Sequence, residues 1–169
     1  MRKHWTDREL DDAIKKMTVI IDTREQVNEH ITDFLDKHKV GYISRKMDIG
    51  DYSVQLEDNT LEKDFVVERK ANIDELCGNL TADRDRFERE FLRAKAHGTK
   101  VFLVVENASW NDILLHNYRS KLTPKSLMAS LLSWQTRCNI TVVFADKKNS
   151  PLLIYNTLRY ALREVLLNG

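Results

Sequence analysis

Three carboxylates and one lysine stand at or near the ends of apolar runs, and their types could support metal-assisted chemistry. Asp22 follows one apolar run, Asp51 precedes another, and Glu68 lies inside a third with Lys70 two positions later. Because side chains alternate along a strand, Glu68 and Lys70 share one face and Arg69 points to the other. Mg²⁺ binds a few carboxylate oxygens and waters, and a phosphate oxygen can complete its shell. Asp51 and Glu68 on paired strands could hold such an ion, beside which Lys70 could orient a water, stabilise developing charge or act as a base.

Each of these side chains also has an explanation without chemistry. Asp22 could be a loop residue near a helix cap, and Asp51 a turn residue after Gly50. Glu68 and Lys70 could form an ion pair on an edge strand, which contributes well under about 1 kcal/mol. Glu68 fits this explanation least well, because it lies inside a hydrophobic strand.

Length and composition indicate one globular domain. The chain has 169 residues, of which 42% are hydrophobic and 31% charged, and this balance excludes disordered and low-complexity proteins. Apolar runs are far shorter than the ~20 residues that cross a bilayer, and the start lacks the apolar core of a signal peptide. We therefore expect a cytoplasmic protein with no membrane partner. Cys77 and Cys138 lie far apart in the chain and show no metal-binding spacing, so we expect both to be reduced.

The net charge of +1 conceals a separation of charge along the chain. Residues 1–112 carry 19 basic and 24 acidic side chains, whereas residues 113–169 carry 8 basic and only 2 acidic ones. Residues 113–145 contain no acid at all. This distribution suits a metal site beside a phosphate-binding face, although chance segregation on a solvated surface would look the same.

Hydrophobic periodicity predicts an α/β domain of three layers with a central mixed sheet. The fully apolar runs 17–21, 101–105 and 140–144 indicate buried strands, and 52–56 with 65–70 indicates a hairpin. Thr23 and Gln26 could cap a helix that carries Val27 and Ile31 on one face. Further helices are expected near residues 6–17, 73–80, 82–96, 123–137 and 150–166. We divide the chain into an N-terminal helical extension, 1–16, and a single domain, 17–169.

An acid, a spacer and then acid-x-Lys on a strand resembles the pattern of restriction-endonuclease-like nucleases. The segments IDTRE (21–25), GDY (50–52) and VERKANID (67–74) occur in that order and make the likeness more specific. Together they closely resemble the nuclease domain of the XPF/Hef structure-specific endonuclease family, whose signature is GD…ERKxxxD. Residues 80–94 and 101–106 resemble the next helix and strand of that family, so the resemblance extends from residue 17 over nearly all of the chain.

The resemblance implies a restriction-endonuclease-like nuclease fold and a Mg²⁺- or Mn²⁺-dependent endonuclease that hydrolyses DNA phosphodiester bonds, on branched or flap DNA. Residue by residue, it implies that Asp22, Asp51 and Glu68 are catalytic metal ligands, that Lys70 is catalytic, and that Arg24, Glu25, Arg69 and Asp74 support them. Family members commonly carry a tandem helix-hairpin-helix module after this domain. The chain ends at Gly169 without one, so we expect the nuclease domain alone.

The supporting side chains leave alternatives open. Arg69 should reach a carboxylate such as Glu25 or Asp74, while an acid in the first turn of a helix is also favoured by the helix dipole alone. Arg24 could contact phosphate or pair with Glu25. Basic side chains that could touch DNA, or could simply be solvated, are Arg84, Arg86, Arg119, Lys121 and Lys125.

The last two predicted helices are apolar over wide arcs. Leu127, Leu131 and Trp134 form one stripe, and Ile154 and Leu158 belong to another. Both arcs could simply cover the sheet, but the XPF-like resemblance implies pairing at this end, so we expect a two-fold homodimer through these helices. Two other functions stay open. One is a non-catalytic DNA-binding or scaffold subunit, which would be expected to lose the acids and lysine; the other is an RNA-directed phosphodiesterase.

Overall fold

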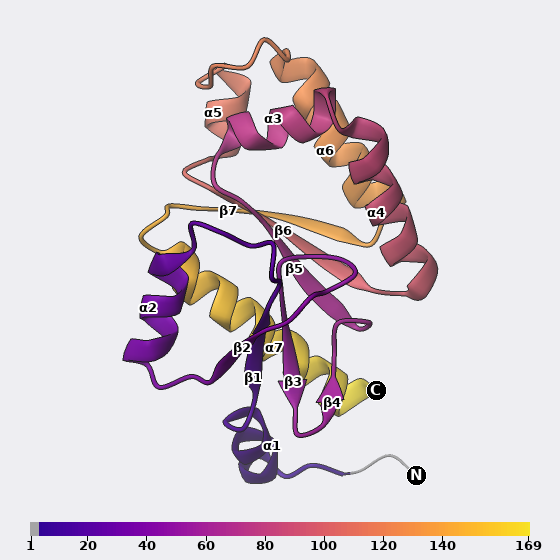
Figure 1. Ribbon diagram of the computed structural model, residues 1–169. Coiled ribbons are helices and arrows are strands. Elements are labelled where there is room, and N and C mark those ends of the chain that lie inside the picture. The colour runs from indigo at the N-terminus through magenta and orange to yellow at the C-terminus, as the bar shows by residue number, and fades with distance from the viewer. Residues whose placement is uncertain (1–3) are drawn as a thin grey trace.

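A twisted sheet lies between two layers of helices in the computed structural model, which describes residues 4–169 (Figure 1). The predicted three-layer α/β fold with a central mixed sheet is confirmed. The elements in these residues are α1 (Asp7–Ile14), β1 (Thr18–Ile21), α2 (Glu29–Lys37), β2 (Tyr42–Ser44), β3 (Tyr52–Leu56), β4 (Asn59–Thr60), β5 (Phe65–Lys70), α3 (Ile73–Thr81), α4 (Arg84–His97), β6 (Lys100–Glu106), α5 (Trp110–Leu114), α6 (Pro124–Arg137), β7 (Ile140–Ala145) and α7 (Ser150–Asn168).

The strand order of the sheet is β2-β1-β3-β5-β6-β7, with the short β4 paired to β3. Strand β3 runs antiparallel to both β1 and β5, whereas β5, β6 and β7 are parallel to one another. The predicted antiparallel pairing of 52–56 with 65–70 is therefore confirmed. It places the start of β3 beside the carboxyl end of β5, which is where the candidate acids occur.

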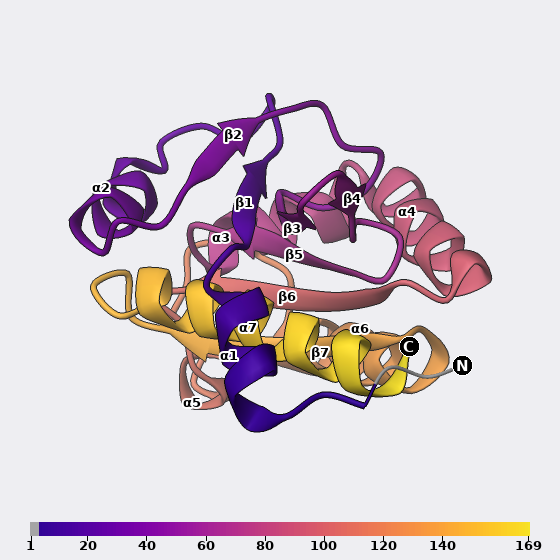
Figure 2. The same cartoon turned by 90° about the horizontal axis from the view of Figure 1, so that it is seen from below.

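Helices cover both faces of the sheet, which explains why its central strands are apolar throughout. On one face α3, α4 and α6 enclose a core that includes Phe87, Leu103 and Trp134. On the other face α1, α2 and α7 enclose a second core that includes Leu35, Val104 and Leu158 (Figure 2). The strands are thus held from both sides, so side chains at their ends have a rigid support.

The predicted N-terminal extension contributes to this second core. The capping box of Thr6 and Glu9 forms as expected at the start of α1. Leu10 and Ile14 are buried, and α1 packs against α7. Residues 1–3 of the predicted 1–16 segment lie outside the described residues. No helix in the described part of the chain is long and apolar enough to cross a membrane.

Two sequence-based expectations about the elements are wrong. Thr23 does not cap a helix, because α2 begins only at Glu29 and Val27 is exposed with a positive φ of 52°. The run 140–144 forms a strand, but β7 lies at the edge of the sheet and only Ile140 is buried. The short helix α5 was not predicted.

Candidate active site

The strand register brings the three predicted acids together at neighbouring ends of β1, β3 and β5. The backbone N–H of Asp22 donates to the carbonyl oxygen of Asp51, and the N–H of Asp51 donates to that of Val67, both at 2.8 Å. Antiparallel partners lie directly opposite each other, so the backbones of Asp22, Asp51 and Glu68 form a row across β1, β3 and β5.

Gly50 fixes the entry into this row. Its φ is +77°, and a Cβ at this position would lie 2.6 Å from the Cβ of Val66. Only glycine fits both the backbone conformation and the close approach to β5. The Gly50-Asp51 pair therefore combines a tight turn with the acid that follows it.

Lys70 and Glu68 share one face of β5, as strand alternation predicted. The Lys70 ammonium lies 2.8 Å from Glu68 Oε1 and 5.0 Å from the ring centroid of Phe87 on α4. Burial lowers the pKa of Lys70, but Glu68 and Asp51 outweigh it, so the pKa lies above its ordinary value. Lys70 is thus a positively charged group in this geometry. Of the three roles considered for it, charge stabilisation and water orientation fit better than action as a base.

Asp51 is a buried carboxyl group whose ionised form is disfavoured by its surroundings. Its Oδ2 accepts a 2.7 Å hydrogen bond from the Arg69 N–H, and within residues 4–169 it forms no ion pair. Burial raises the pKa of Asp51 well above its ordinary value, and the nearby carboxylates of Glu68 and Glu25 raise it further. Repulsion between neighbouring carboxylates is what a divalent cation relieves, so the Asp51–Glu68 pair fits such an ion.

Asp22 is held differently, because both oxygens of its carboxylate accept hydrogen bonds from the protein. Its Oδ1 accepts hydrogen bonds from Arg24 N (2.9 Å) and Nε (2.7 Å), and its Oδ2 accepts one from Met47 N (2.6 Å). Burial raises the pKa of Asp22, but these hydrogen bonds more than offset it and leave the pKa lowered. Within residues 4–169 no group of three His, Cys, Asp or Glu side chains is arranged to hold a metal ion. Arg24 and Met47 thus engage both Asp22 oxygens and shape the turn after β1, and the role of Asp22 as a metal ligand stays a prediction.

Arg69 occupies the opposite face of β5 and is buried. Its guanidinium lies 2.6 Å from Glu25 Oε1 and 2.9 Å from Glu106 Oε2. The predicted contact with Glu25 is confirmed, whereas the alternative partner, Asp74, is not used. Glu106 also accepts a hydrogen bond from the Ser150 hydroxyl, and His30 Nε2 lies 2.7 Å from its Oε1. These contacts tie β5 to the turn after β1, to α2 and to α7.

Asp74 lies at the start of α3 and contacts the loop between α5 and α6. Its Oδ1 accepts hydrogen bonds from the backbone N–H groups of Arg119 (2.9 Å) and Ser120 (2.7 Å). Asp74 therefore fastens the loop between α5 and α6. The five basic side chains predicted to touch DNA are all exposed, two at the start of α4 and three in or after that loop: Arg84, Arg86, Arg119, Lys121 and Lys125.

Comparison with known proteins identifies the family of this chain. Residues 21–155 match the ERCC4 domain. The chain belongs to the ERCC4-domain family. The structure is similar to XPF from Aeropyrum pernix, with 25% sequence identity, a TM-score of 0.65, and coverage of 88% of this chain and 63% of that one. It also resembles the same XPF in complex with DNA, with 23% identity, a TM-score of 0.62, and coverage of 86% and 65%.

The present chain thus spans just under two thirds of each XPF chain. No curated protein sequence matches it significantly. The XPF/Hef resemblance and the nuclease fold predicted from the motifs are confirmed.

Two acids near the site of this ERCC4 domain were missed by the sequence interpretation. Glu106 is fully buried at the end of β6. The sequence signal for it was a single acid directly after the apolar run 101–105. Glu90 lies on α4 one turn after Phe87; burial and the nearby Glu68 raise its pKa. Its side chain also pairs with Arg86 at 3.7 Å, so one of the predicted DNA-binding arginines is linked to the site.

Proposed function

We propose that this ERCC4 domain is a divalent-metal-dependent endonuclease that hydrolyses DNA phosphodiester bonds, with branched or flap DNA as substrate. The observation that carries the proposal is the pairing of Asp51 and Glu68 on adjacent strands beside the Lys70 ammonium. Two neighbouring carboxylates, of which Asp51 has no ion pair within residues 4–169, are the donors that Mg²⁺ or Mn²⁺ binds, with waters and substrate oxygens in the remaining positions.

Asp51 and Glu68 would hold the ion, which when bound supplies a Lewis acid for the scissile phosphate and lowers the pKa of a water. Other groups of the chain would stabilise charge and orient the carboxylates. The Lys70 ammonium stabilises the negative charge that grows on the phosphate oxygens. The hydrogen bond from the Arg69 N–H orients the Asp51 carboxylate, and the Arg24 contacts of Asp22 fix the turn beside it.

DNA as the partner is supported by the similar XPF chain, whose structure is a complex with DNA. Exposed arginines at the start of α4 and the basic loop before α6 offer phosphate contacts on the helical layer that also covers Lys70 through Phe87. A non-catalytic DNA-binding subunit is the alternative. The retained cluster of Asp51, Glu68 and Lys70 speaks against it, because such a subunit has no use for these charges.

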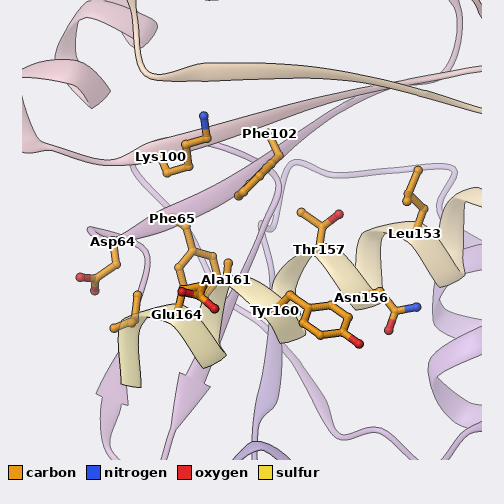
Figure 3. A pocket seen from close by; sticks show the side chains of 11 residues that line it. Asp64, Phe65, Lys100, Phe102, Leu153, Asn156, Thr157, Tyr160, Ala161 and Glu164 are labelled. Carbon is orange, nitrogen blue, oxygen red and sulfur yellow. The ribbon is translucent and has the colours of Figure 1, made fainter. Parts of the chain in front are cut away.

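We also propose a homodimer through the C-terminal helices, with the exposed side of α7 at the contact. The stripes 127–134 and 154–162 are mostly core, since Leu131 and Leu158 are fully buried. However, Tyr160 on α7 is 58% exposed, beside a cavity of about 540 Å³ between α7 and the N-terminal ends of β5 and β6 (Figure 3). Within residues 4–169 no strand pairs with the outer edge of β7, the strand that precedes α7, so this end of the domain suits a second copy.

Light scattering over a micromolar concentration series tests the homodimer. We expect a dimer mass for the wild-type chain and a monomer mass for Tyr160→Glu, which places a charge in the apolar groove. A monomer mass for the wild-type chain at every concentration would refute the dimer.

Cleavage of labelled DNA tests the enzymatic proposal. Linear duplex, single strand, flap, fork and four-way junction should be incubated with the wild-type chain in Mg²⁺, Mn²⁺ or EDTA, with Glu68→Gln as the inactive control. We expect metal-dependent cuts in the branched substrates by the wild-type chain only. Equal cutting by a folded Glu68→Gln protein, or cutting that persists in EDTA, would contradict the proposal.

A further inference from the structure

Two neighbouring leucines project into solvent where α5 ends. Leu114 is 57% exposed and Leu115 63% exposed, although the preceding Ile113 is fully buried and anchors the helix in the core. Exposing two adjacent large apolar side chains to water is unfavourable, so such a pair often marks a surface that a partner covers.

The loop that carries these leucines is preorganised by its own hydrogen bonds. His116 Nε2 lies 2.8 Å from the carbonyl oxygen of Ser120, and the Tyr118 hydroxyl donates to the carbonyl oxygen of Leu122 at 2.7 Å. Asp74 fastens the same loop to α3 through two backbone N–H groups. A rigid loop loses little conformational freedom on binding, so it suits a contact surface.

The attachment through Asp74 also places the loop near the candidate active site. Asp74 follows Lys70 by four residues, which span at most about 14 Å of chain. With the reach of its side chain, the point where the loop is attached, Arg119 and Ser120, lies within about 20 Å of Lys70, or about six nucleotides along a DNA strand.

The charge around the leucines selects the kind of partner. Arg119, Lys121 and Lys125 are exposed, and residues 113–145 contain no acid. The two nearest acids along the loop and helix are engaged: Asp74 binds backbone N–H groups and Asp112 binds Ser109 and Asn117. Cations beside apolar side chains match a partner that combines phosphates with an uncovered apolar face.

A DNA fork has such a face. Within a continuous duplex each base pair is covered by its neighbours, whereas the last pair before a branch exposes one face. Apolar side chains such as leucine can take the place of the missing base pair in the stack. The phosphates on either side would meet the basic residues of the loop.

We propose that Leu114 and Leu115 pack on the exposed face of the last base pair at a DNA branch and so give this domain its preference for branched over linear DNA. The proposal rests on DNA being the substrate, as proposed above. It assigns the leucines to junction recognition and the neighbouring cations to sequence- and structure-independent phosphate binding.

Binding measured in EDTA, with no cleavage, tests this division of labour. The dissociation constants of the wild-type chain and of the double variant Leu114→Ser/Leu115→Ser are compared for a fork and for a linear duplex of the same sequence. We expect the fork-to-duplex affinity ratio to fall about tenfold in the double variant, with duplex affinity unchanged. Ile43→Ser, which alters a side chain 39% exposed on β2, is the matched control and should keep the ratio.

A reciprocal variant sharpens the test. Replacing Arg119, Lys121 and Lys125 by Gln should weaken binding to both substrates and reduce the slope of log K against log salt by about 2 to 3, with the ratio retained.

Three results would overturn the proposal. These are an equal affinity of the wild-type chain for fork and duplex, an unchanged ratio in the leucine variant, and conversion of a dimer to a monomer by the leucine substitutions. A wild-type chain that prefers forks in EDTA yet cuts nothing in Mg²⁺ would instead refute the enzymatic proposal and leave the leucine contact supported.

Discussion

Two carboxylates on opposite sides of β5, Glu106 and Asp51, show how differently one sheet can treat a buried acid. Burial raises the pKa of Glu106, but hydrogen bonds from Arg69, Ser150 and His30 more than offset it and leave the pKa lowered. Asp51 receives one backbone hydrogen bond, and its pKa lies well above the ordinary value because burial and neighbouring carboxylates dominate. One acid is satisfied by the protein and the other is not.

This difference separates an acid that stabilises the fold from an acid that is available to bind a cation. A carboxylate that the fold has already satisfied stabilises the fold and has little left to offer a ligand. A carboxylate whose charge is left unbalanced destabilises the fold and gains from a cation. Arg69 joins the two sides, because its side chain binds Glu106 while its backbone N–H binds Asp51.

The largest effect, on the cleavage rate, is expected at the cluster of Asp51, Glu68 and Lys70. Lys70→Ala should lower the cleavage rate by about 10² to 10³-fold, because it removes the charge that meets the developing negative phosphate. Rates under single-turnover conditions measure this effect. Lys37→Ala, which changes an exposed lysine at the end of α2, should leave the rate within about twofold. A Lys70→Ala protein as active as the wild type would contradict the proposed role of Lys70 in cleavage.

The next largest effect, on stability, is expected at the buried ion pairs of Arg69. Arg69→Met leaves Glu25 and Glu106 buried without their cation, which should reduce the free energy of unfolding by about 3–5 kcal/mol. Urea unfolding measures this loss. Arg8→Met changes an arginine whose side chain is 94% exposed and should cost under about 0.5 kcal/mol. Equal losses from both substitutions would mean that the buried pairs contribute no more than a surface charge.

A smaller loss is expected from Glu106→Gln, about 1–2 kcal/mol at pH 7, because one charged hydrogen-bond partner of Arg69 becomes neutral. The folded pKa of Glu106 lies below its usual 4.5. Its contribution is therefore present above pH 4.5 and lost as the pH falls through the folded value. The difference between variant and wild type should shrink below about pH 4. A difference that is constant from pH 7 to pH 3 would show that charge plays no part.

Asp51→Asn should act in the opposite direction and raise the free energy of unfolding by about 1 kcal/mol in metal-free buffer at neutral pH. The amide oxygen of Asn can still accept the Arg69 N–H. Since the folded pKa of Asp51 is raised, the stability that its proton provides is present below its usual 3.8 and lost as the pH rises through the folded value. The gain should therefore vanish in acid. A destabilised Asp51→Asn protein at pH 7 would contradict the comparison of the two acids.

Much of the fold could be predicted from local patterns. The strands β3 and β5 were bounded correctly, because alternation and turn residues mark their ends. Strand alternation also placed Glu68 and Lys70 together and Arg69 on the other face, where Glu25, one of its two predicted partners, binds it. These inferences need only the period of a strand, which tertiary contacts rarely override.

The failures arose where a side chain is used over a long distance. Thr23 and Gln26 match a helix start, but Arg24 and Glu25 are engaged by Asp22 and Arg69, which keeps the segment out of a helix. The hydrogen bond that Asp22 accepts from the Met47 N–H was missed because Met47 lies 25 residues away. Sequence periodicity holds no information on such contacts.

Binding of Mn²⁺, followed by the loss of its solution EPR signal, tests the pairing of Asp51 and Glu68 most directly, because it requires neither DNA nor turnover. We expect the wild-type chain to bind the ion and both Asp51→Asn and Glu68→Gln to lose most of that affinity. Asp22→Asn tests the third predicted ligand, and we expect a smaller loss there, since the Asp22 oxygens already accept hydrogen bonds from Arg24 and Met47. Undiminished binding by a folded Asp51→Asn protein, or no binding by the wild type, would contradict the assignment of this pair as the metal site.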